Sequence, residues 1–161
     1  MADNKDVIKC PACGKEMKKI FIQDSGINID ICIDGCGGIN FDNRELEKCD
    51  ENHEKIDEII NSIEGKTFES IDKNAVRYCP CCYEMPMTRM GAADGEIEID
   101  VCNNCGGKFL DHGELLKIRE SQGKNNNSID KALESIYDLN DSKIKANKRR
   151  DFFIDIVHKY I

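Results

Sequence analysis

Four pairs of cysteines, arranged as two similar sets of four, constrain this chain of 161 residues more than any other feature. The first set comprises Cys10 and Cys13 with Cys32 and Cys36, and the second comprises the run Cys79-Pro80-Cys81-Cys82 with Cys102 and Cys105. Four thiolates complete the tetrahedral shell of a structural zinc ion and leave no open coordination position. The spacing therefore predicts two zinc sites, each at the centre of a small folded unit.

The size of the units and the N-terminal sequence also favour metal. Each four-cysteine unit spans fewer than forty residues, and units this small rarely bury enough apolar surface to fold without a metal or disulfides. The first residues are polar and charged, and no apolar run is long enough to cross a bilayer. We therefore expect a cytoplasmic protein without a membrane partner, where thiols stay reduced and paired cysteines indicate metal binding.

The two halves repeat each other well beyond the cysteines. Ile29-Asp30-Ile31-Cys32 matches Ile99-Asp100-Val101-Cys102, and a Gly-Gly pair follows the second cysteine pair of each half. Phe41-Asp42-Asn43-Arg44-Glu45-Leu46 matches Leu110-Asp111-His112-Gly113-Glu114-Leu115. The offset varies between 69 and 70 because each half holds one extra residue at a different place. This pattern indicates an internal duplication.

Each half has the parts of a β-hairpin between its two cysteine pairs. Residues 18–22 are typical of a strand, Asp24-Ser25-Gly26 of a turn, and residues 27–31 of a return strand whose isoleucines share one face. The second half places its turn at Asp94-Gly95, before a second alternating strand. Such a hairpin brings both cysteine pairs of a half to one end.

A helix is predicted to start after each hairpin. Asp42 and Asp111 occupy N-cap positions, and Glu45 and Glu114 follow three residues later, where a capping-box carboxylate belongs. Because capping accounts for both glutamates, we favour it over a catalytic role. Apolar spacing then predicts an amphipathic helix over residues 43–64, which ends near Gly65 and leads into a connector.

Together these motifs resemble the transcription factor IIB-type zinc-ribbon family. The resemblance covers about residues 10–48 and 79–118, and it rests on Cys-Pro-x-Cys, a hairpin, Asp-x-Cys-x-x-Cys-Gly-Gly and Asp-x-x-Glu-Leu. It implies that each half is a four-cysteine zinc ribbon, and its name implies kinship with ribbons that contact RNA polymerase, although a fold does not carry a function. In the second half it assigns the ligand role to Cys79 and Cys82. The predicted ligands of two zinc ions are thus Cys10, Cys13, Cys32, Cys36, Cys79, Cys82, Cys102 and Cys105.

Two departures from the family pattern concern the metal sites. Three residues instead of two separate Cys32 from Cys36, so that turn must bulge. Tyr83 stands where the first half has Gly14, and a left-handed backbone is awkward for a bulky residue.

Two cysteines and the histidines are left over. We favour a packing role for Cys49, on a helix face, and a spectator role for Cys81, with a redox-sensitive thiol or a replacement ligand as the alternative. His53, His112 and His158 are not needed to complete a set of four, and His112 is expected to be exposed.

The predicted fold is a small metal-stabilised α+β protein with two zinc ribbons, each followed by a helix, and a C-terminal helical segment. Its divisions are 7–48 (first ribbon), 49–78 (helix and connector), 79–120 (second ribbon) and 128–161 (C-terminal helical segment). One apolar helix face in that segment comprises Ile129, Leu133, Ile136 and Tyr137, and another comprises Phe152, Phe153, Ile156, Val157, Tyr160 and Ile161. The second face is expected to pack on the ribbons or the other helix, or to dock a partner or a second copy of the chain.

Charge favours a protein partner over nucleic acid. The chain has 23 Lys and Arg against 31 Asp and Glu, a formal net charge of −8, whereas nucleic-acid binding relies on basic side chains. The one locally basic stretch is residues 143–161. We expect a non-catalytic module with an unidentified protein partner, with nucleic acid bound through the basic stretch as the less favoured choice and a homo-oligomer formed through the C-terminal helix as a further one. A link to transcription rests on the resemblance alone.

Two other classes of function were weighed against this one. The sequence has no glycine-rich phosphate loop, no nucleophile–base pair and no metal site with a missing ligand, so an enzyme is not expected. A rubredoxin-like iron electron carrier or a thiol redox switch is the alternative, because four thiolates also hold iron. The second cysteine pairs lack the proline expected at such iron sites, and aromatic residues are few.

Overall fold

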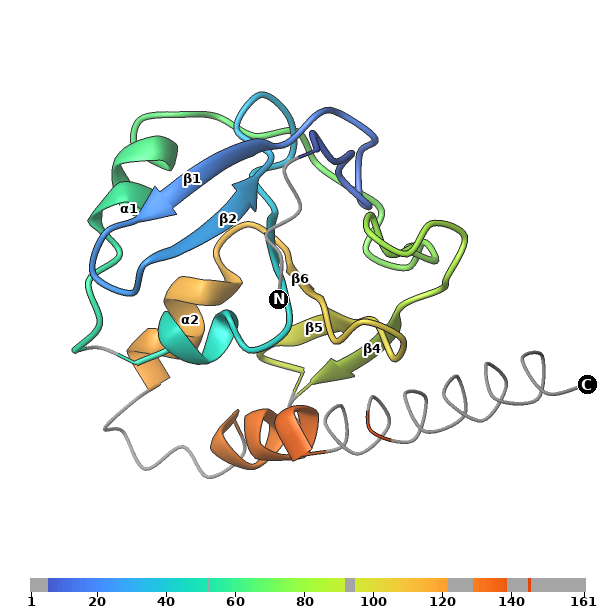
Figure 1. Ribbon diagram of the computed structural model, residues 1–161. Coiled ribbons are helices and arrows are strands. Elements are labelled where there is room, and N and C mark those ends of the chain that lie inside the picture. The colour runs from blue at the N-terminus through green and yellow to red at the C-terminus, as the bar shows by residue number, and fades with distance from the viewer. Residues whose placement is uncertain (1–5, 52, 92–94, 122–128, 139–144, 146–161) are drawn as a thin grey trace, which may run out of the picture.

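The computed structural model describes residues 6–51, 53–91, 95–121, 129–138 and 145, and the structural statements below concern these residues. Six strands form one antiparallel sheet in the order β1-β2-β3-β6-β5-β4 (Figure 1). The strands are β1 (Lys18–Ile22), β2 (Ile27–Ile31), β3 (Ile39–Phe41), β4 (Thr88–Gly91), β5 (Glu98–Val101) and β6 (Lys108–Leu110). The helices are the 3₁₀ turn η1 (Leu46–Lys48), α1 (Asp57–Ile63) and α2 (Glu114–Ser121), and residues 129–138 are also helical.

Each half forms the predicted hairpin and adds a short third strand. In the first half Lys18 lies opposite Ile31 and Ile22 lies opposite Ile27, so the chain reverses at the predicted turn. Gly26 closes this turn with a φ of 69°, a conformation that favours glycine. The alternation in β2 buries Ile27, Ile29 and Ile31 on one face, as the sequence predicts.

The two ribbons join into a single sheet through their third strands. Asn40 of β3 lies opposite Phe109 of β6, so the antiparallel pairing crosses from one half of the chain to the other. Matching strands stand at mirrored positions in the strand order, β1 with β4, β2 with β5 and β3 with β6. The duplication therefore folds around an approximate twofold axis between β3 and β6. The four predicted divisions of the chain remain sequence-based predictions.

One face of the sheet carries the main hydrophobic core. Helices α1 and α2 and the helix of residues 129–138 lie around the sheet (Figure 1). Their buried apolar side chains form one cluster with the isoleucines and leucines of the strands. The largest side chains buried there are Phe41, Ile22, Ile29, Ile31, Leu46, Ile59, Ile97, Ile99, Leu110 and Ile118. This shared core gives each small ribbon apolar contacts that neither half supplies alone.

The second face of the sheet packs against the cysteine-bearing loops. Phe109 is fully buried there, in a cluster that also contains cysteines of both halves. Its ring lies directly on the backbone of Gly38, where an added Cβ would stand 2.3 Å from the ring. One aromatic side chain from the second ribbon thus fills the space beside the metal-binding loop of the first.

The predicted helix over residues 43–64 is wrong, because its described residues form only η1 and α1. Arg44 adopts a φ of 67°, which no α-helix accommodates. The side chain of Arg119 in α2 donates hydrogen bonds to two backbone carbonyl groups of this stretch, Cys49 O and Glu54 O, at 2.7 Å each. Tertiary hydrogen bonds hold these carbonyls away from helical partners. The predicted end near Gly65 is correct, since α1 ends at Ile63.

The predicted capping positions need a similar correction. Glu45 and Glu114 do accept hydrogen bonds from the backbone N–H groups of Asp42 and Asp111, at 2.8 Å in both halves. The helices begin later than predicted, however, with η1 at Leu46 and α2 at Glu114. Neither aspartate is therefore an N-cap. Gly113 has a φ of 89° at the position that matches Arg44, so a left-handed residue closes an equivalent turn in each half.

The first predicted face of the C-terminal segment is confirmed. Ile129, Leu133 and Ile136 are buried in the main core, and Tyr137 packs against it. The second predicted face, at residues 152–161, lies outside the described residues. No helix in the described part of the chain is long and apolar enough to cross a membrane.

Candidate metal centres

The structure gathers the eight predicted ligand cysteines into two groups of four. The groups are Cys10, Cys13, Cys32 and Cys36, and Cys79, Cys82, Cys102 and Cys105; within each group the sulfur atoms lie within 4.8 Å of one another. The sulfur atoms of Cys10 and Cys36, and those of Cys13 and Cys32, lie 3.4 Å apart, and the sulfur atoms of Cys79 and Cys105 lie 3.6 Å apart. A zinc–sulfur bond of about 2.3 Å gives a tetrahedron with edges of about 3.8 Å. Both groups therefore have the donor set and the size that one zinc ion requires.

The same backbone turn positions the second cysteine pair of each group. In the first half the N–H of Cys32 donates to Gly38 O, and the N–H of Gly37 donates to Cys32 O, at 2.9 Å each. In the second half the N–H of Cys102 donates to Gly107 O at 2.8 Å, and the N–H of Gly106 donates to Cys102 O at 3.0 Å. The extra residue between Cys32 and Cys36 is thus accommodated inside an otherwise equivalent turn.

Glycine is required inside the longer turn of the first half. A Cβ atom on Gly35 would lie 2.7 Å from Cys32 Sγ and 2.9 Å from Cys13 Sγ. These separations are far shorter than any ordinary carbon–sulfur contact. The bulge predicted from the spacing is therefore tolerated only because its third residue has no side chain.

We expect Gly35→Ala to lower zinc affinity at the first group alone. The new methyl group must displace two ligand sulfurs, and disturbing the surroundings of a metal ligand typically costs about 10–100-fold in affinity. Competition with a chromophoric chelator measures both sites in one titration. Asp34→Ala is the control, because it alters an exposed side chain in the same turn and leaves the glycine in place. Equal affinities at both sites in Gly35→Ala would contradict the expectation.

Contacts among the sulfurs stabilise one thiolate in each group. The thiol of Cys10 donates a hydrogen bond to Cys36, which lowers the pKa of Cys36 to about 6 and raises the pKa of Cys10. In the second group hydrogen bonds, the largest from Cys102, lower the pKa of Cys79. Each group therefore holds one thiolate readily, and zinc must displace the remaining protons when it binds. Zinc affinity consequently falls as the pH falls.

Amide groups point at the sulfurs of the second group. The N–H of Gly107 donates to Cys105 Sγ at 3.4 Å, and the N–H of Cys82 donates to Cys79 Sγ at 3.4 Å. The side-chain amide of Asn104 donates to Cys82 Sγ at 3.3 Å. Such donors offset the negative charge that four thiolates place around a divalent ion.

The turn at the first cysteine pair of the second ribbon, which we call its first knuckle, contains two residues in a strained left-handed conformation. Tyr83 and Glu84 have φ values of 43° and 52°, whereas Gly14 alone, with a φ of 77°, makes the corresponding turn. The second half therefore places its extra residue here and uses two left-handed residues where the first half uses one glycine. The sequence-based concern about Tyr83 is borne out by its conformation.

We expect Tyr83→Gly to stabilise the zinc-loaded chain by about 0.5–1 kcal/mol. A left-handed conformation costs a residue with a Cβ about 1–2 kcal/mol, and the greater backbone freedom of glycine in the unfolded chain offsets part of the gain. Urea unfolding monitored by circular dichroism measures the change. Tyr83→Ala keeps the Cβ and serves as the control, with no comparable gain expected. Equal midpoints for the glycine and alanine variants would contradict the strain argument.

Each metal-binding loop also touches the other ribbon. Phe68 of the connector packs on Gly37, and its ring centroid lies 4.5 Å from that of the exposed His112. On the other side, Cys81 Sγ lies 3.9 Å from Asp42 Oδ1. The two metal sites are consequently parts of one packed unit and do not stand at the ends of separate lobes.

The two leftover cysteines belong to neither group. Cys49 is fully buried in the main core, and burial raises the pKa of its thiol to about 12. An inert, packed thiol is the role that the sequence predicts for it. Cys81 is half-buried beside the ligands of the second group, so its predicted spectator role stays a prediction.

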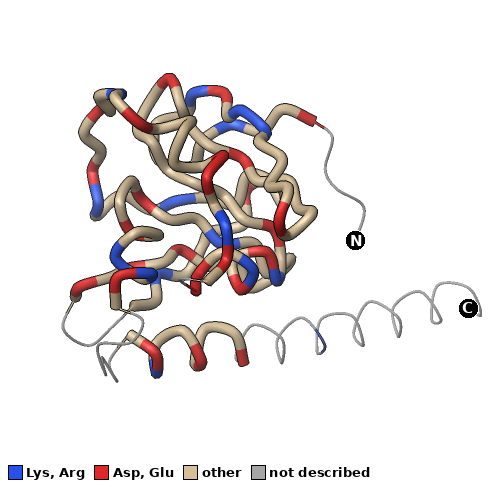
Figure 2. The backbone as a smooth tube through the Cα atoms, turned by 90° about the vertical axis from the view of Figure 1, so that its left-hand side faces the viewer, with Lys and Arg blue, Asp and Glu red and all other residues tan. Residues whose placement is uncertain are grey.

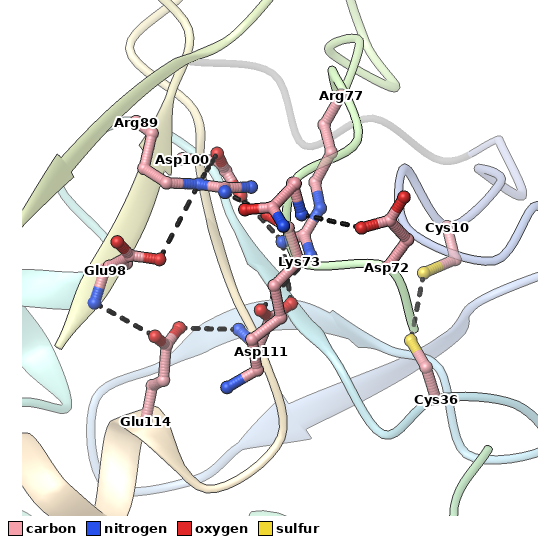
Figure 3. A network of polar contacts seen from close by, with 11 residues as sticks. Cys10, Cys36, Asp72, Lys73, Arg77, Arg89, Glu98, Asp100, Asp111 and Glu114 are labelled. Atoms are coloured by element: carbon pink, nitrogen blue, oxygen red, sulfur yellow. Dashed lines mark hydrogen bonds and ion pairs between the residues drawn. The ribbon is translucent and has the colours of Figure 1, made fainter. Parts of the chain in front are cut away.

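A buried arginine, which the sequence pattern did not indicate, forms ion pairs with two aspartates of the second ribbon (Figure 3). Arg77 is 3% exposed. Its Nη1 donates to Asp100 Oδ2 at 2.7 Å and to Asp111 Oδ1 at 2.6 Å, and its Nη2 donates to Asp111 Oδ2 at 3.1 Å. Its guanidinium carbon also lies 5.3 Å from the centroid of the Phe109 ring. Burial disfavours the charged form, but hydrogen bonds to the two carboxylates outweigh it and raise the pKa of Arg77.

The signal for Arg77 was present in the repeat. Ile8 occupies the matching place in the first half and is buried. A charged residue at a position that the other half buries needs a charged partner. In the first half the counterpart of Asp100 is Asp30, which pairs with Lys19, the counterpart of Arg89, at 3.3 Å in a partly exposed ion pair.

A second buried cation links the second metal site to the C-terminal helix. Lys108 is 1% exposed, and its Nζ donates to Gly106 O at 3.1 Å. The same Nζ lies 5.6 Å from the ring centroid of Tyr137, whose hydroxyl donates to Asp50 Oδ2 at 2.7 Å. The helix of residues 129–138 is thereby fixed over β6, close to the turn that carries Cys105.

Two groups of four thiols, held by two joined β-hairpins, define a tandem zinc-ribbon protein in which each group fits one zinc ion. The sequence model of the TFIIB-type zinc ribbon, described as a transcription factor zinc-finger, matches residues 9–51 and 78–121. These segments make up more than half of the chain, so the chain belongs to this family. No curated protein and no solved structure matches the chain. The family resemblance and the zinc cofactor predicted from the sequence are confirmed.

Proposed function

We propose that the chain is a non-catalytic binding module in which two zinc ions hold a protein-binding surface in shape. One observation carries the proposal: both metal centres have four cysteine sulfurs within 4.8 Å, a complete tetrahedral donor set. Zinc with four thiolates has no position for a substrate or a reactive water. Its role in such a site is to stabilise the fold.

The charge of the chain supports a protein partner. The formal net charge is −8. Each zinc ion together with its four thiolates adds a further charge of about −2 to the chain. Figure 2 shows acidic residues beside basic ones along the described chain, including the helix of residues 129–138. Nucleic-acid binding by charge neutralisation is therefore disfavoured on this part of the molecule. The description of the family, transcription factor zinc-finger, makes the transcription machinery the first place to look for the partner.

A pull-down paired with a nucleic-acid shift assay tests the proposal. We expect the zinc-loaded chain to retain a protein partner from native cells, and the Cys102→Ser chain to lose it, because the second ribbon then lacks a ligand. The shift assay is run over a range of salt concentrations with DNA and RNA. Tight, salt-sensitive nucleic-acid binding that Arg149→Ala and Arg150→Ala together abolish would overturn the proposal.

The identity of the metal is tested separately. A colourless purified chain with about two zinc ions per chain is expected. A coloured sample that contains iron in place of zinc would favour the electron-carrier alternative, since iron bound by four thiolates absorbs visible light and changes oxidation state.

A further inference from the structure

At one antiparallel bridge the second ribbon exposes apolar side chains where the first ribbon exposes charged ones. In the first ribbon Lys9 pairs with Glu16 in an isolated bridge that precedes the hairpin, and in the second ribbon Tyr78 pairs with Pro86 at the same place. Tyr78 is 52% exposed and Pro86 is exposed as well, and beside them Val76 is 67% exposed, as is its counterpart Val7 in the first ribbon. We call Val76, Tyr78 and Pro86 the second-ribbon apolar surface. Because the two ribbons share one ancestry and one fold, this difference is not a requirement of the zinc site.

The second-ribbon apolar surface lies on the same face of the sheet as the helix of residues 129–138. Tyr137 stands over Lys108, which lies opposite Val101, and Val101 in turn lies opposite Thr88. Directly opposed residues share a face. Alternation along the extended chain then places Pro86 on the face of Thr88, and Tyr78 opposite Pro86 on that face too.

The chain leaves this helix within reach of the surface. Lys108 is separated from Pro86 by two strand spacings, to Thr88 at the start of β4, and by two further residues of extended chain before β4, which amounts to less than about 20 Å. From Asp138, the last residue of the described helix, to Phe152 the chain has fourteen steps. These cover about 21 Å as a helix and about twice that when extended. The segment 152–161 can therefore reach the second-ribbon apolar surface in either form.

The composition of residues 146–161 complements this surface. The segment contains seven large apolar residues, and all of them except Ile154 follow a helical spacing, namely Phe152, Phe153, Ile156, Val157, Tyr160 and Ile161. It also carries the bases Lys148, Arg149, Arg150 and Lys159 against the acids Asp151 and Asp155. Next to the surface stand the exposed Glu84 and the second group of four thiolates, which remains negative when zinc is bound. The segment and the second-ribbon apolar surface therefore complement each other, because both expose apolar area and their surroundings carry charges of opposite sign.

We propose that residues 146–161 dock on the second-ribbon apolar surface of the same chain. The segment covers Val76, Tyr78 and Pro86 with its apolar face and sets its basic residues toward the second metal centre. At the matching place the first ribbon keeps the exposed Val7 but has the charged residues Lys9 and Glu16 in place of Tyr78 and Pro86. The proposal does not rest on the proposed function, because it concerns only how the chain covers its own surface.

Trypsin cleavage after Lys148, Arg149 and Arg150 tests the proposal on the full zinc-loaded chain. The variant Tyr78→Lys with Pro86→Glu gives the second ribbon the charged pair of the first. We expect it to be cut in this stretch about tenfold faster than the unaltered chain, because proteolysis follows the population of the undocked form. Phe21→Lys is the matched control, since Phe21 is 53% exposed on β1 of the other ribbon. Its cleavage rate is expected to stay unchanged.

A second variant keeps the test independent of the fold of the ribbon. Phe153→Asp with Val157→Asp alters only the segment, and both zinc ions should remain bound. We expect the amide NMR signals of Val76, Tyr78 and Met85 to shift in this variant, while those of Val7, Lys9 and Lys15 in the first ribbon stay in place. Equal cleavage of all chains together with unshifted signals would overturn the proposal. Protection that grows with protein concentration would also overturn it, because the occupant would then be the segment of a second copy.

Discussion

Chelation of zinc from the reduced chain is expected to abolish the folding of both ribbons in one step. Zinc binding supplies about 10–16 kcal/mol of apparent free energy to small thiolate domains, whereas a whole domain is usually stable by only about 5–15 kcal/mol. The ribbons should unfold together because β3 pairs with β6 and because Phe109 packs on the metal-binding loop of the other half. Thermal melts followed by circular dichroism, before and after a chelator and after zinc is restored, measure the effect.

Two variants of one knuckle serve as a matched pair for this experiment. Cys79→Ser removes a ligand of the second group, and we expect it to lower the melting transition of the entire sheet. Cys81→Ser changes a thiol that belongs to neither group, so we expect it to keep both zinc ions and an unchanged melt. Unaltered melts after the metal has been stripped would show that the apolar core alone holds the fold. Two separate transitions would show that the ribbons fold independently.

Arg77→Met is expected to destabilise the zinc-loaded chain by about 3–5 kcal/mol, the usual cost of removing one partner from a buried ion pair. Asp100 and Asp111 would both lose the guanidinium that lies within 2.7 Å of each of them. Methionine fills much of the same volume, so the loss reports on charge more than on packing. Urea unfolding at constant zinc concentration measures it.

The control for Arg77 is the second arginine at the same carboxylate. Arg89 lies 3.3 Å from Asp100, with a side chain 29% exposed. We expect Arg89→Met to cost about 1 kcal/mol or less, as for partly solvated ion pairs. Adding Asp100→Asn and Asp111→Asn to Arg77→Met should recover much of the stability, because no uncompensated buried charge then remains. Similar losses for the two arginine variants would contradict the buried-charge argument.

The hairpins and the ligand groups were predictable because their determinants are local. Two cysteines with two or three residues between them lie on one turn and can bind the same metal ion. A return strand such as residues 27–31 shows its buried face through alternation. The helix over residues 43–64 failed for the opposite reason. Its apolar spacing was genuine, but Arg119, 65 positions and more away, captures the carbonyls of Cys49 and Glu54.

The buried polar groups were beyond reach of pattern analysis for a related reason. Arg77 and Lys108 are ordinary surface residue types, and a local pattern does not show that folding encloses them. Only the alignment of Arg77 with the buried Ile8 offered a hint. The pairing of β3 with β6 had no signal at all, since each strand has three residues and either could stand at a sheet edge.

The amino-acid sequence by itself determined that this chain binds two zinc ions through two duplicated hairpins, because thiolate donors at short spacing bind metal through local geometry. The tertiary structure alone decided that the two halves form one sheet and that Phe109 of the second half packs on the metal-binding loop of the first. It also decided that Arg77 and Lys108 are buried in the second ribbon. Those features depend on contacts between residues far apart in the chain. Their free energy comes from burial and charge pairing, which no short stretch of sequence displays.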